Sequence, residues 1–226
     1  HLAARTKIDL QAARDSIVAD FGVEVTIYSL DLSLGANVEQ LVNDCGDVDI
    51  PVDNAGTIPG GTIEEINEER WRTAWELKVF GYINMMRECY RMMKSRGRGV
   101  IVNVIGNAGN QAPAEYAAGV SADAMLEVLT RTLGGDSLDH GIRVVGVSPG
   151  DLLNERGIMF LRRQAEEELG DPERWSERLA ELPGGRAGTS EEIADAIVFL
   201  ASPRSNYTSG VVLTVDGGVS ARRAVM

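Results

Sequence analysis

Glycine and small polar residues follow three apolar runs of this 226-residue chain, in segments that could hold a ligand. The segments are Asp53-Asn54-Ala55-Gly56, Gly106-Asn107-Ala108-Gly109 and Ser148-Pro149-Gly150. Because their side chains are small, the backbone there can approach a bound molecule closely. Tyr116 follows the second segment, and its hydroxyl could exchange a proton with such a ligand where a cation lowers its pKa. Four residues after Tyr116 the chain has Val120 instead of a lysine.

Strands and helices alternate along the chain, and the alternation predicts how these segments are positioned. The predicted strands are 1–4, 23–30, 48–52, 99–104, 142–147 and 211–215. The predicted helices are 10–21, 38–45, 67–93, one that ends at 133, and 190–201. This pattern is typical of a doubly wound, Rossmann-type parallel sheet in a three-layer α/β/α arrangement. Such sheets bind ligands at the carboxyl ends of their strands, where the three segments lie.

Four parts of the chain together resemble the short-chain dehydrogenase/reductase family, in particular its 3-oxoacyl-carrier-protein reductases. They are residues 53–56, 99–133, 142–150 and 213–218. The resemblance implies an NAD(P)-dependent oxidoreductase that interconverts a carbonyl and a secondary alcohol. The Tyr-x-x-x-Lys signature of that family is not present, so the chain is divergent at the catalytic positions.

The resemblance implies a set of cofactor-binding residues at the ends of several strands. They are Arg5, Asp31, Leu32, Asn54, Ala55, Gly56, Pro149 and Gly150. Arg5 directly follows the first predicted strand, at the position that contacts the adenosine ribose in the family. An acidic residue there would accept the ribose hydroxyls of NAD, whereas an arginine pairs with the 2′-phosphate of NADP. We therefore expect NADP, with NAD as the alternative cofactor.

The positions that the family uses for catalysis are altered in this chain. Gly106 stands at the serine position, and Lys78 stands at the asparagine position of the long predicted helix. An ungapped alignment puts Gly119 at the tyrosine and Asp123 at the lysine. A loop shortened by three residues instead makes Tyr116 the tyrosine, with no lysine after it. We favour the ungapped alignment, because an insertion within a helix would rotate its apolar face.

Two interpretations of these positions stay open. In the first, the site is rebuilt from three candidate catalytic residues: Tyr116, Lys78 and Asp123. Tyr116 would lie one helical turn before the tyrosine position, Lys78 would supply the cation from the opposing helix, and Asp123 would orient Lys78. In the second, Lys78 and Tyr116 are structural, and a catalytically silent protein binds a nucleotide or a protein partner.

The start of the chain aligns with the second strand of the family. We therefore expect the first strand and its glycine-rich loop to lie upstream of His1, and a single Rossmann-type domain over residues 1–226. A sheet without that central strand would expose two parallel strand edges.

Residues 151–188 interrupt the alternation and resemble the insertion that family members use as a substrate lid. Met159, Phe160 and Trp175 are the residues that we expect to face the pocket. The alternative is an ordinary pair of surface helices. Resemblance alone implies a homodimer or homotetramer.

Composition excludes several classes of function. A formal net charge of −12 argues against a nucleic-acid partner. Cys45 and Cys89 are isolated and lack neighbouring histidine pairs, so no metal site is expected. The chain contains no apolar run of membrane-spanning length and no signal-peptide pattern. These features predict a cytoplasmic protein that acts on a small molecule and has no membrane partner.

Overall fold

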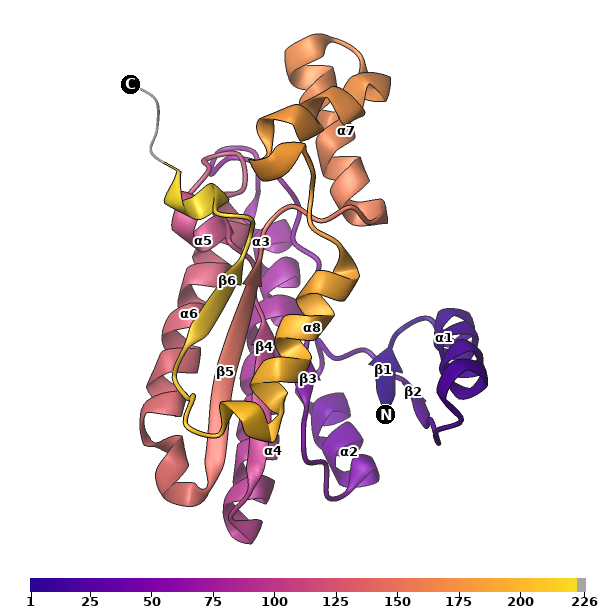
Figure 1. Ribbon diagram of the computed structural model, residues 1–226, viewed down its shortest axis with the longest axis vertical. Coiled ribbons are helices and arrows are strands. Elements are labelled where there is room, and N and C mark those ends of the chain that lie inside the picture. The colour runs from indigo at the N-terminus through magenta and orange to yellow at the C-terminus, as the bar shows by residue number, and fades with distance from the viewer. Residues whose placement is uncertain (223–226) are drawn as a thin grey trace.

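The strands of the chain pair in parallel, in two separate groups. The computed structural model describes residues 1–222, except for the side chains of residues 110 and 111. One sheet contains, in this order, β3 (Val52–Asp53), β4 (Gly99–Val104), β5 (Ile142–Pro149) and β6 (Val212–Val215). The other contains β1 (Leu2–Ala4) and β2 (Ile27–Ser29), which lie to one side of the larger sheet in Figure 1.

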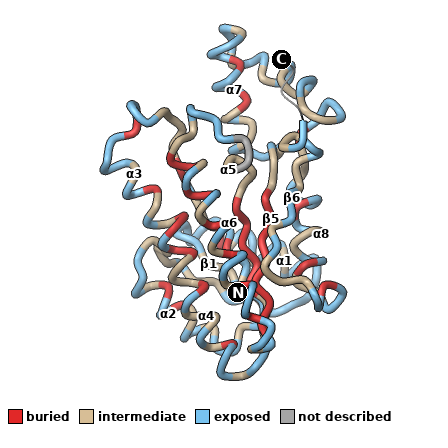
Figure 2. Tube along the Cα trace, turned by 90° about the vertical axis from the view of Figure 1, so that its left-hand side faces the viewer, coloured by how far each residue is buried: buried red, intermediate tan, exposed pale blue. Residues whose placement is uncertain are grey.

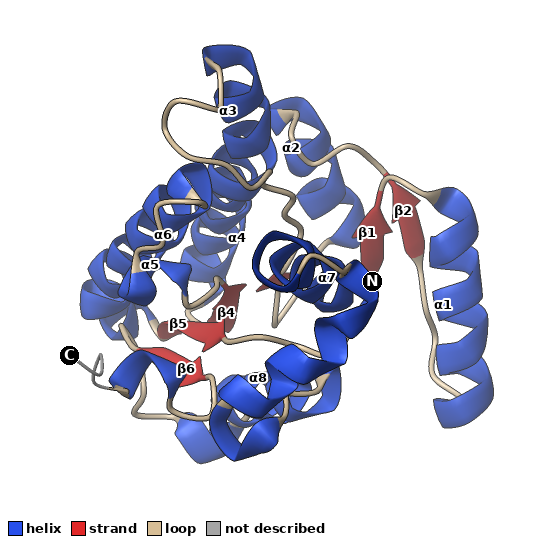
Figure 3. Cartoon of the chain, turned by 90° about the horizontal axis from the view of Figure 1, so that it is seen from above, coloured by secondary structure: helices blue, strands red, loops and turns tan. Residues whose placement is uncertain are grey.

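The two central strands of the larger sheet, β4 and β5, are buried on both faces. Ile101 and Val144 pack towards α4 (Tyr82–Arg96) and α6 (Ala117–Ser137), whereas Val102 and Val145 pack towards α8 (Ser190–Ala201). Figure 3 shows α4 and α6 on one side of the sheet and α8 on the other, and Figure 2 shows the burial along α6 and β5. Burial on both faces explains why these strands are predominantly apolar. The predicted three-layer Rossmann-type arrangement is confirmed.

The strands near the amino terminus are shorter than predicted. The predicted strand 23–30 pairs only at β2, and the predicted strand 48–52 pairs only at β3. Each of these strands has a single hydrogen-bonded neighbour, so few of its residues enter a ladder. The helices α1 (Lys7–Phe21) and α2 (Gly35–Cys45) follow β1 and β2. Within residues 1–222, no helix has the length and apolar character that crossing a membrane requires.

The prediction of one regular α-helix over 67–93 is wrong, because a π-helical stretch interrupts it. The structure has α3 (Glu68–Trp75), then a π-helical stretch Glu76–Gly81, then α4. A π-helical stretch changes which side chains face inward, and such stretches are frequent at functional sites. A Cβ atom at Gly81 would lie 3.1 Å from the carbonyl oxygen of Leu32, so the helix passes close to the backbone there. Lys78 is carried on this stretch and is buried.

The helix that ends near 133 also differs from the prediction. The structure has a short α5 (Ala108–Gln111) and then the long α6, which continues to Ser137. Tyr116 immediately precedes α6, with a non-helical backbone (φ −137°, ψ 39°). Tyr116 is therefore the residue that precedes the first turn of α6, three residues before Gly119, rather than a residue inside the helix.

The insertion after β5 rises above the carboxyl end of the sheet, as Figure 1 shows for α7. It contains α7 (Glu155–Leu169) and a 3₁₀ helix (Pro172–Glu181). Two backbone hydrogen bonds close its base: Leu153 donates to Gly188 at 2.8 Å, and Gly188 donates to Asp151 at 2.9 Å.

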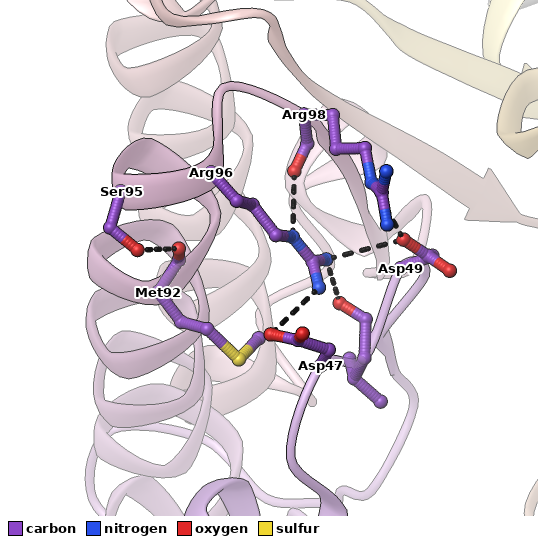
Figure 4. A network of polar contacts seen from close by, with 7 residues as sticks. Asp47, Asp49, Met92, Ser95, Arg96 and Arg98 are labelled. Carbon is purple, nitrogen blue, oxygen red and sulfur yellow. Dashed lines mark hydrogen bonds and ion pairs between the residues drawn. The ribbon is translucent and has the colours of Figure 1, made fainter.

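A network of contacts around Arg96 lies at the end of the molecule opposite to this insertion (Figure 4). Arg96, in the last turn of α4, donates to the carbonyl oxygens of Arg98 and Val48. Its guanidinium lies 3.5 Å from a carboxylate oxygen of Asp47 and 3.5 Å from one of Asp49. These contacts tie the end of α4 to the segment before β3, far from the carboxyl ends of the strands.

Candidate active site

A cavity of about 880 Å³ lies at the carboxyl ends of β4 and β5. Its lining includes four predicted cofactor residues, Asn54, Gly56, Pro149 and Gly150, and all three predicted catalytic residues, Tyr116, Lys78 and Asp123. The structure therefore brings together residues from four separate segments of the chain.

A second cavity, of about 630 Å³, lies between β1 and β3. Leu32, Asn54 and Ala55 line it, so Asn54 borders both cavities. Arg5 and Asp31 follow β1 and β2, respectively. Two hydrogen bonds from Ser33 lower the pKa of Asp31, and the charge of Arg5 lowers it further.

The ring of Tyr116 lies against the backbone of Gly119. A Cβ atom at position 119 would be only 1.9 Å from Cε1 of the ring and 2.1 Å from Cζ. Gly119 is the residue that the ungapped alignment puts at the family's tyrosine position. The phenol ring of Tyr116 therefore occupies the space next to that position, although it comes from three residues earlier.

Two further glycines leave room for polar side chains in the same way. A Cβ atom at Gly106 would lie 2.6 Å from Oδ2 of Asp123, and one at Gly56 would lie 2.7 Å from Cδ of Lys78. Asp123 thus lies where a serine at position 106 would need to be.

The ammonium group of Lys78 is held by the backbone at the end of β4. Its Nζ donates to the carbonyl oxygens of Val104 at 3.0 Å and Ile105 at 2.8 Å, and to the hydroxyl of Tyr82 at 3.2 Å. A lysine has three N–H donors, so all of them are used. Lys78 therefore acts on Asp123 through its charge rather than through a hydrogen bond.

Three buried ionisable groups at this site have strongly shifted pKa values. Burial raises the pKa of Asp53 to about 8 and that of Asp123 to about 6, and the charge of Lys78 opposes both shifts. Burial lowers the pKa of Lys78 to about 8, which Asp123 and Asp53 oppose. Such shifts are common where a protein does proton chemistry.

The cation beside the Tyr116 hydroxyl is Arg156. Nη2 of Arg156 lies 3.5 Å from that hydroxyl, while Nη1 donates to the carbonyl oxygen of Gly56 at 2.9 Å. The Tyr116 ring meets Phe160 edge-on, with centroids 6.1 Å apart. Burial is the main cause of the raised pKa of Tyr116, which the charge of Arg156 opposes.

Sequence reasoning missed Arg156 and Tyr82. Arg156 has the appearance of an ordinary charged residue at the start of a surface helix. Tyr82 was detectable in principle, because it follows Lys78 by four residues, and its hydroxyl donates to Val104 at 2.7 Å. Of the residues expected to face the pocket, Phe160 lines the cavity, whereas Met159 is 71% exposed. Trp175 lies on the 3₁₀ helix, outside the cavity lining.

Comparison with known proteins agrees with this fold and site. The family profile described as enoyl-(acyl carrier protein) reductase matches residues 3–220. An uncharacterized oxidoreductase from Thermotoga maritima is 35% identical over 209 residues, which cover 91% of this chain and 81% of the relative. The chain belongs to the short-chain dehydrogenase/reductase family, a family of NAD(P)-dependent oxidoreductases.

Two solved structures have closely similar folds. L-sorbose reductase from Gluconobacter frateurii, complexed with NADPH and L-sorbose, matches with a TM-score of 0.89 and 29% identity, over 98% of this chain and 87% of that one. An NADPH-bound short-chain oxidoreductase from Pseudomonas aeruginosa PAO1, described as containing an atypical catalytic center, matches with a TM-score of 0.85 and 29% identity. That match covers 98% of this chain and 86% of the other.

Proposed function

We propose that this protein is an NADP-dependent reductase of a carbonyl compound, with Tyr116 as the proton donor. The observation that carries the proposal is the position of the Tyr116 ring in the space beside Gly119. A tyrosine hydroxyl at that place, in a cavity bordered by Pro149 and Gly150, can reach a ligand at the carboxyl ends of β4 and β5.

The residues of the larger cavity fit the nicotinamide half of a dinucleotide. Gly150 leaves no room for a side chain, since a Cβ atom there would lie 2.6 Å from Cβ of Asp216. Gly150 and Gly56 both line the larger cavity, where a nicotinamide and its ribose would lie. NADPH, when bound, would supply the hydride for the carbonyl carbon. The NADPH in both solved relatives supports this assignment, with NAD as the alternative.

The adenosine half of the cofactor would lie near the ends of β1 and β2. Arg5 would pair with the 2′-phosphate, because its guanidinium matches phosphate geometry. Asp31 and Leu32 would contact the adenine ring. Asn54 and Ala55 would lie between the two halves, since they border the space between β3 and β1.

Tyr116 performs the proton transfer in this proposal. Because burial raises its pKa, the hydroxyl is protonated at neutral pH and can give a proton but not accept one. This protonation state favours carbonyl reduction over alcohol oxidation. Arg156 stabilises the tyrosinate that remains, whereas the negative charge of Asp123 opposes it.

The remaining assignments follow from the family and the shape of the chain. We propose one Rossmann-type domain over residues 1–226, in which residues 151–188 cover a small-molecule substrate. We also propose a cytoplasmic homodimer or homotetramer. The closed base of the insertion, at Leu153 and Gly188, supports a lid that moves as a unit.

Titration with NADPH, followed by a panel of small ketones and aldehydes, tests this function. We expect saturable quenching of tryptophan fluorescence and oxidation of NADPH with at least one carbonyl. Saturable binding of NADPH with no turnover of any carbonyl would contradict the proposal.

The second candidate is a catalytically silent protein that binds a nucleotide or a protein partner. The bonding of Lys78 favours it, because all three donors of the ammonium group are used within the fold. Binding of NADPH without turnover is the result that this alternative predicts.

A further inference from the structure

The cavity contains an arginine that is held by contacts with two neighbouring residues. Arg156 lies in the first turn of α7 and lines the cavity. One N–H donates to Gly56, and the guanidinium lies over the ring of Phe160, 5.7 Å from its centroid. A guanidinium has five N–H donors, so these contacts leave others for a ligand.

Arg156 differs from the other arginines of this region in having no carboxylate partner among the described residues. Arg163, which also lines the cavity, pairs with Glu167 at 3.4 Å. Arg178 pairs with Glu168 at 2.6 Å. These two pairs balance the acidic residues of the cavity rim and leave the charge of Arg156 available.

The other carboxyl groups of the cavity limit the charge of a ligand. Asp123, Asp151 and Glu115 line it, and no ion pair joins any of them to Arg156 in the described part of the chain. Together they disfavour a ligand with several negative charges. A single carboxylate matches the planar guanidinium and can accept two parallel hydrogen bonds from it.

The distance between Arg156 and Tyr116 determines how far the carboxylate of a substrate can lie from its reacting carbonyl group. Nη2 of Arg156 lies 3.5 Å from the Tyr116 hydroxyl. A carbonyl oxygen that takes the proton of Tyr116 must therefore lie close to the guanidinium. In a 2-oxo acid the carboxylate is bonded directly to the carbonyl carbon. Arg156 can therefore bind the carboxylate while Tyr116 contacts the carbonyl oxygen.

We propose that the substrate is a 2-oxo acid whose carboxylate is bound by Arg156, and whose apolar remainder contacts Phe160 and Ile58, which line the same cavity. The assignment rests on the proposed function, because it takes Tyr116 as the proton donor. The carbonyl carbon receives the hydride of NADPH, and the carbonyl oxygen receives the proton of Tyr116. The products are a 2-hydroxy acid and NADP⁺, and the tyrosinate regains a proton from water.

A matched pair of substrates tests the assignment: 4-methyl-2-oxopentanoate and its methyl ester, each with NADPH. We expect kcat/KM of the acid to exceed that of the ester by roughly 100-fold, as two charge-assisted hydrogen bonds require. Arg156→Met should lower this ratio to near one. Arg162→Met is the control, since Arg162 pairs with Glu173 at 3.1 Å on the same helix, and should leave the ratio unchanged. A wild-type protein without preference for the acid, or an equal loss for both substrates in Arg156→Met, would overturn the assignment.

Calorimetric titration with oxamate separates the carboxylate site from the catalytic proposal. Oxamate resembles a 2-oxo acid but is not reduced. With NADPH present, we expect oxamate to bind the wild-type protein and the Arg162→Met variant, and to bind Arg156→Met roughly 100-fold more weakly. If this pattern appears without oxidation of NADPH by either carbonyl, the reductase function fails while the carboxylate site stands. Absence of oxamate binding to the wild-type protein would overturn the site.

Discussion

Tyr116 and Gly119 are fitted to each other, because the ring of the tyrosine fills the space that any side chain at position 119 would need. Inside a helix, alanine is more favourable than glycine by about 1 kcal/mol. Glycine at position 119 therefore carries a conformational cost, and the close approach of the Tyr116 ring is the reason that the structure offers for it.

The substitution Gly119→Ala tests this fit. The added methyl group should displace the Tyr116 ring and lower kcat by roughly 10- to 100-fold, because a misplaced catalytic group is costly even when the shift is small. NADPH affinity and helix content should be unchanged. Gly135→Ala is the matched control on α6, since a Cβ atom there meets nothing within 4 Å. Equal turnover of the two variants would contradict the role of the ring position.

Introducing a serine at position 106, where the family has its catalytic serine, should not increase activity. In Gly106→Ser the new Cβ atom would lie 2.6 Å from Oδ2 of Asp123, on a backbone with φ of +143° that disfavours side chains. We expect no gain in kcat and a loss of about 1–3 kcal/mol in the free energy of unfolding, measured by urea denaturation. The double variant with Asp123→Ala should recover part of that loss. A gain in turnover from Gly106→Ser alone would show that Asp123 does not hold this space.

The buried charge of Lys78 should matter for turnover even without a hydrogen bond to Tyr116. Lys78→Met removes a cation that Asp123 and Asp53 both sense, and it leaves the carbonyl of Ile105 without this donor. We expect kcat to fall about 10-fold or more, with a change of about 1–3 kcal/mol in the free energy of unfolding. Unchanged turnover in a folded Lys78→Met variant would show that Lys78 has no part in the proton transfer.

Asp53 should make the fold less stable as the pH rises. Its folded-state pKa of about 8 lies above the ordinary value, so the protonated form is favoured in the folded state. The associated stability is present at low pH and is lost as the pH rises towards 8. Asp53→Asn should remove this dependence. The free energy of unfolding of the variant, minus that of the wild-type protein, should therefore grow by on the order of 1 kcal/mol for each pH unit between pH 5 and 8.

Urea denaturation at pH 5, 7 and 9 measures that difference. Asp195→Asn, at an exposed position of α8, is the control and should show no such trend. Curves for Asp53→Asn and the wild-type protein that stay parallel across this range would refute the role of Asp53.

The sheet and its faces were predictable from the sequence because β4 and β5 are buried on both sides. That burial requires predominantly apolar runs, such as 99–104 and 142–147, each of which contains a single buried polar or charged residue, Asn103 or Arg143. The π-helical stretch at Glu76–Gly81 was not predictable, since the apolar residues at 71, 75, 79 and 83 have a spacing that a regular α-helix would also explain.

The sequence predicted which residues form the candidate site, but it did not predict how they contact one another. Lys78, Tyr116 and Asp123 do line one cavity. Their partners depend on tertiary approach: Lys78 bonds to the end of β4, and Arg156 reaches Tyr116 from a helix 40 residues further along the chain. No local pattern marks an arginine that crosses a cavity in this way.

The most direct test of the account is a single-turnover measurement of NADPH oxidation by Tyr116→Phe, with the carbonyl that the wild-type protein reduces fastest. Tyr207→Phe is the control, because Tyr207 is 96% exposed and lies outside the cavity lining. We predict a rate at least about 100-fold lower for Tyr116→Phe, with NADPH affinity retained, and a wild-type rate for Tyr207→Phe. A wild-type rate for Tyr116→Phe would contradict the claim that Tyr116 donates the proton.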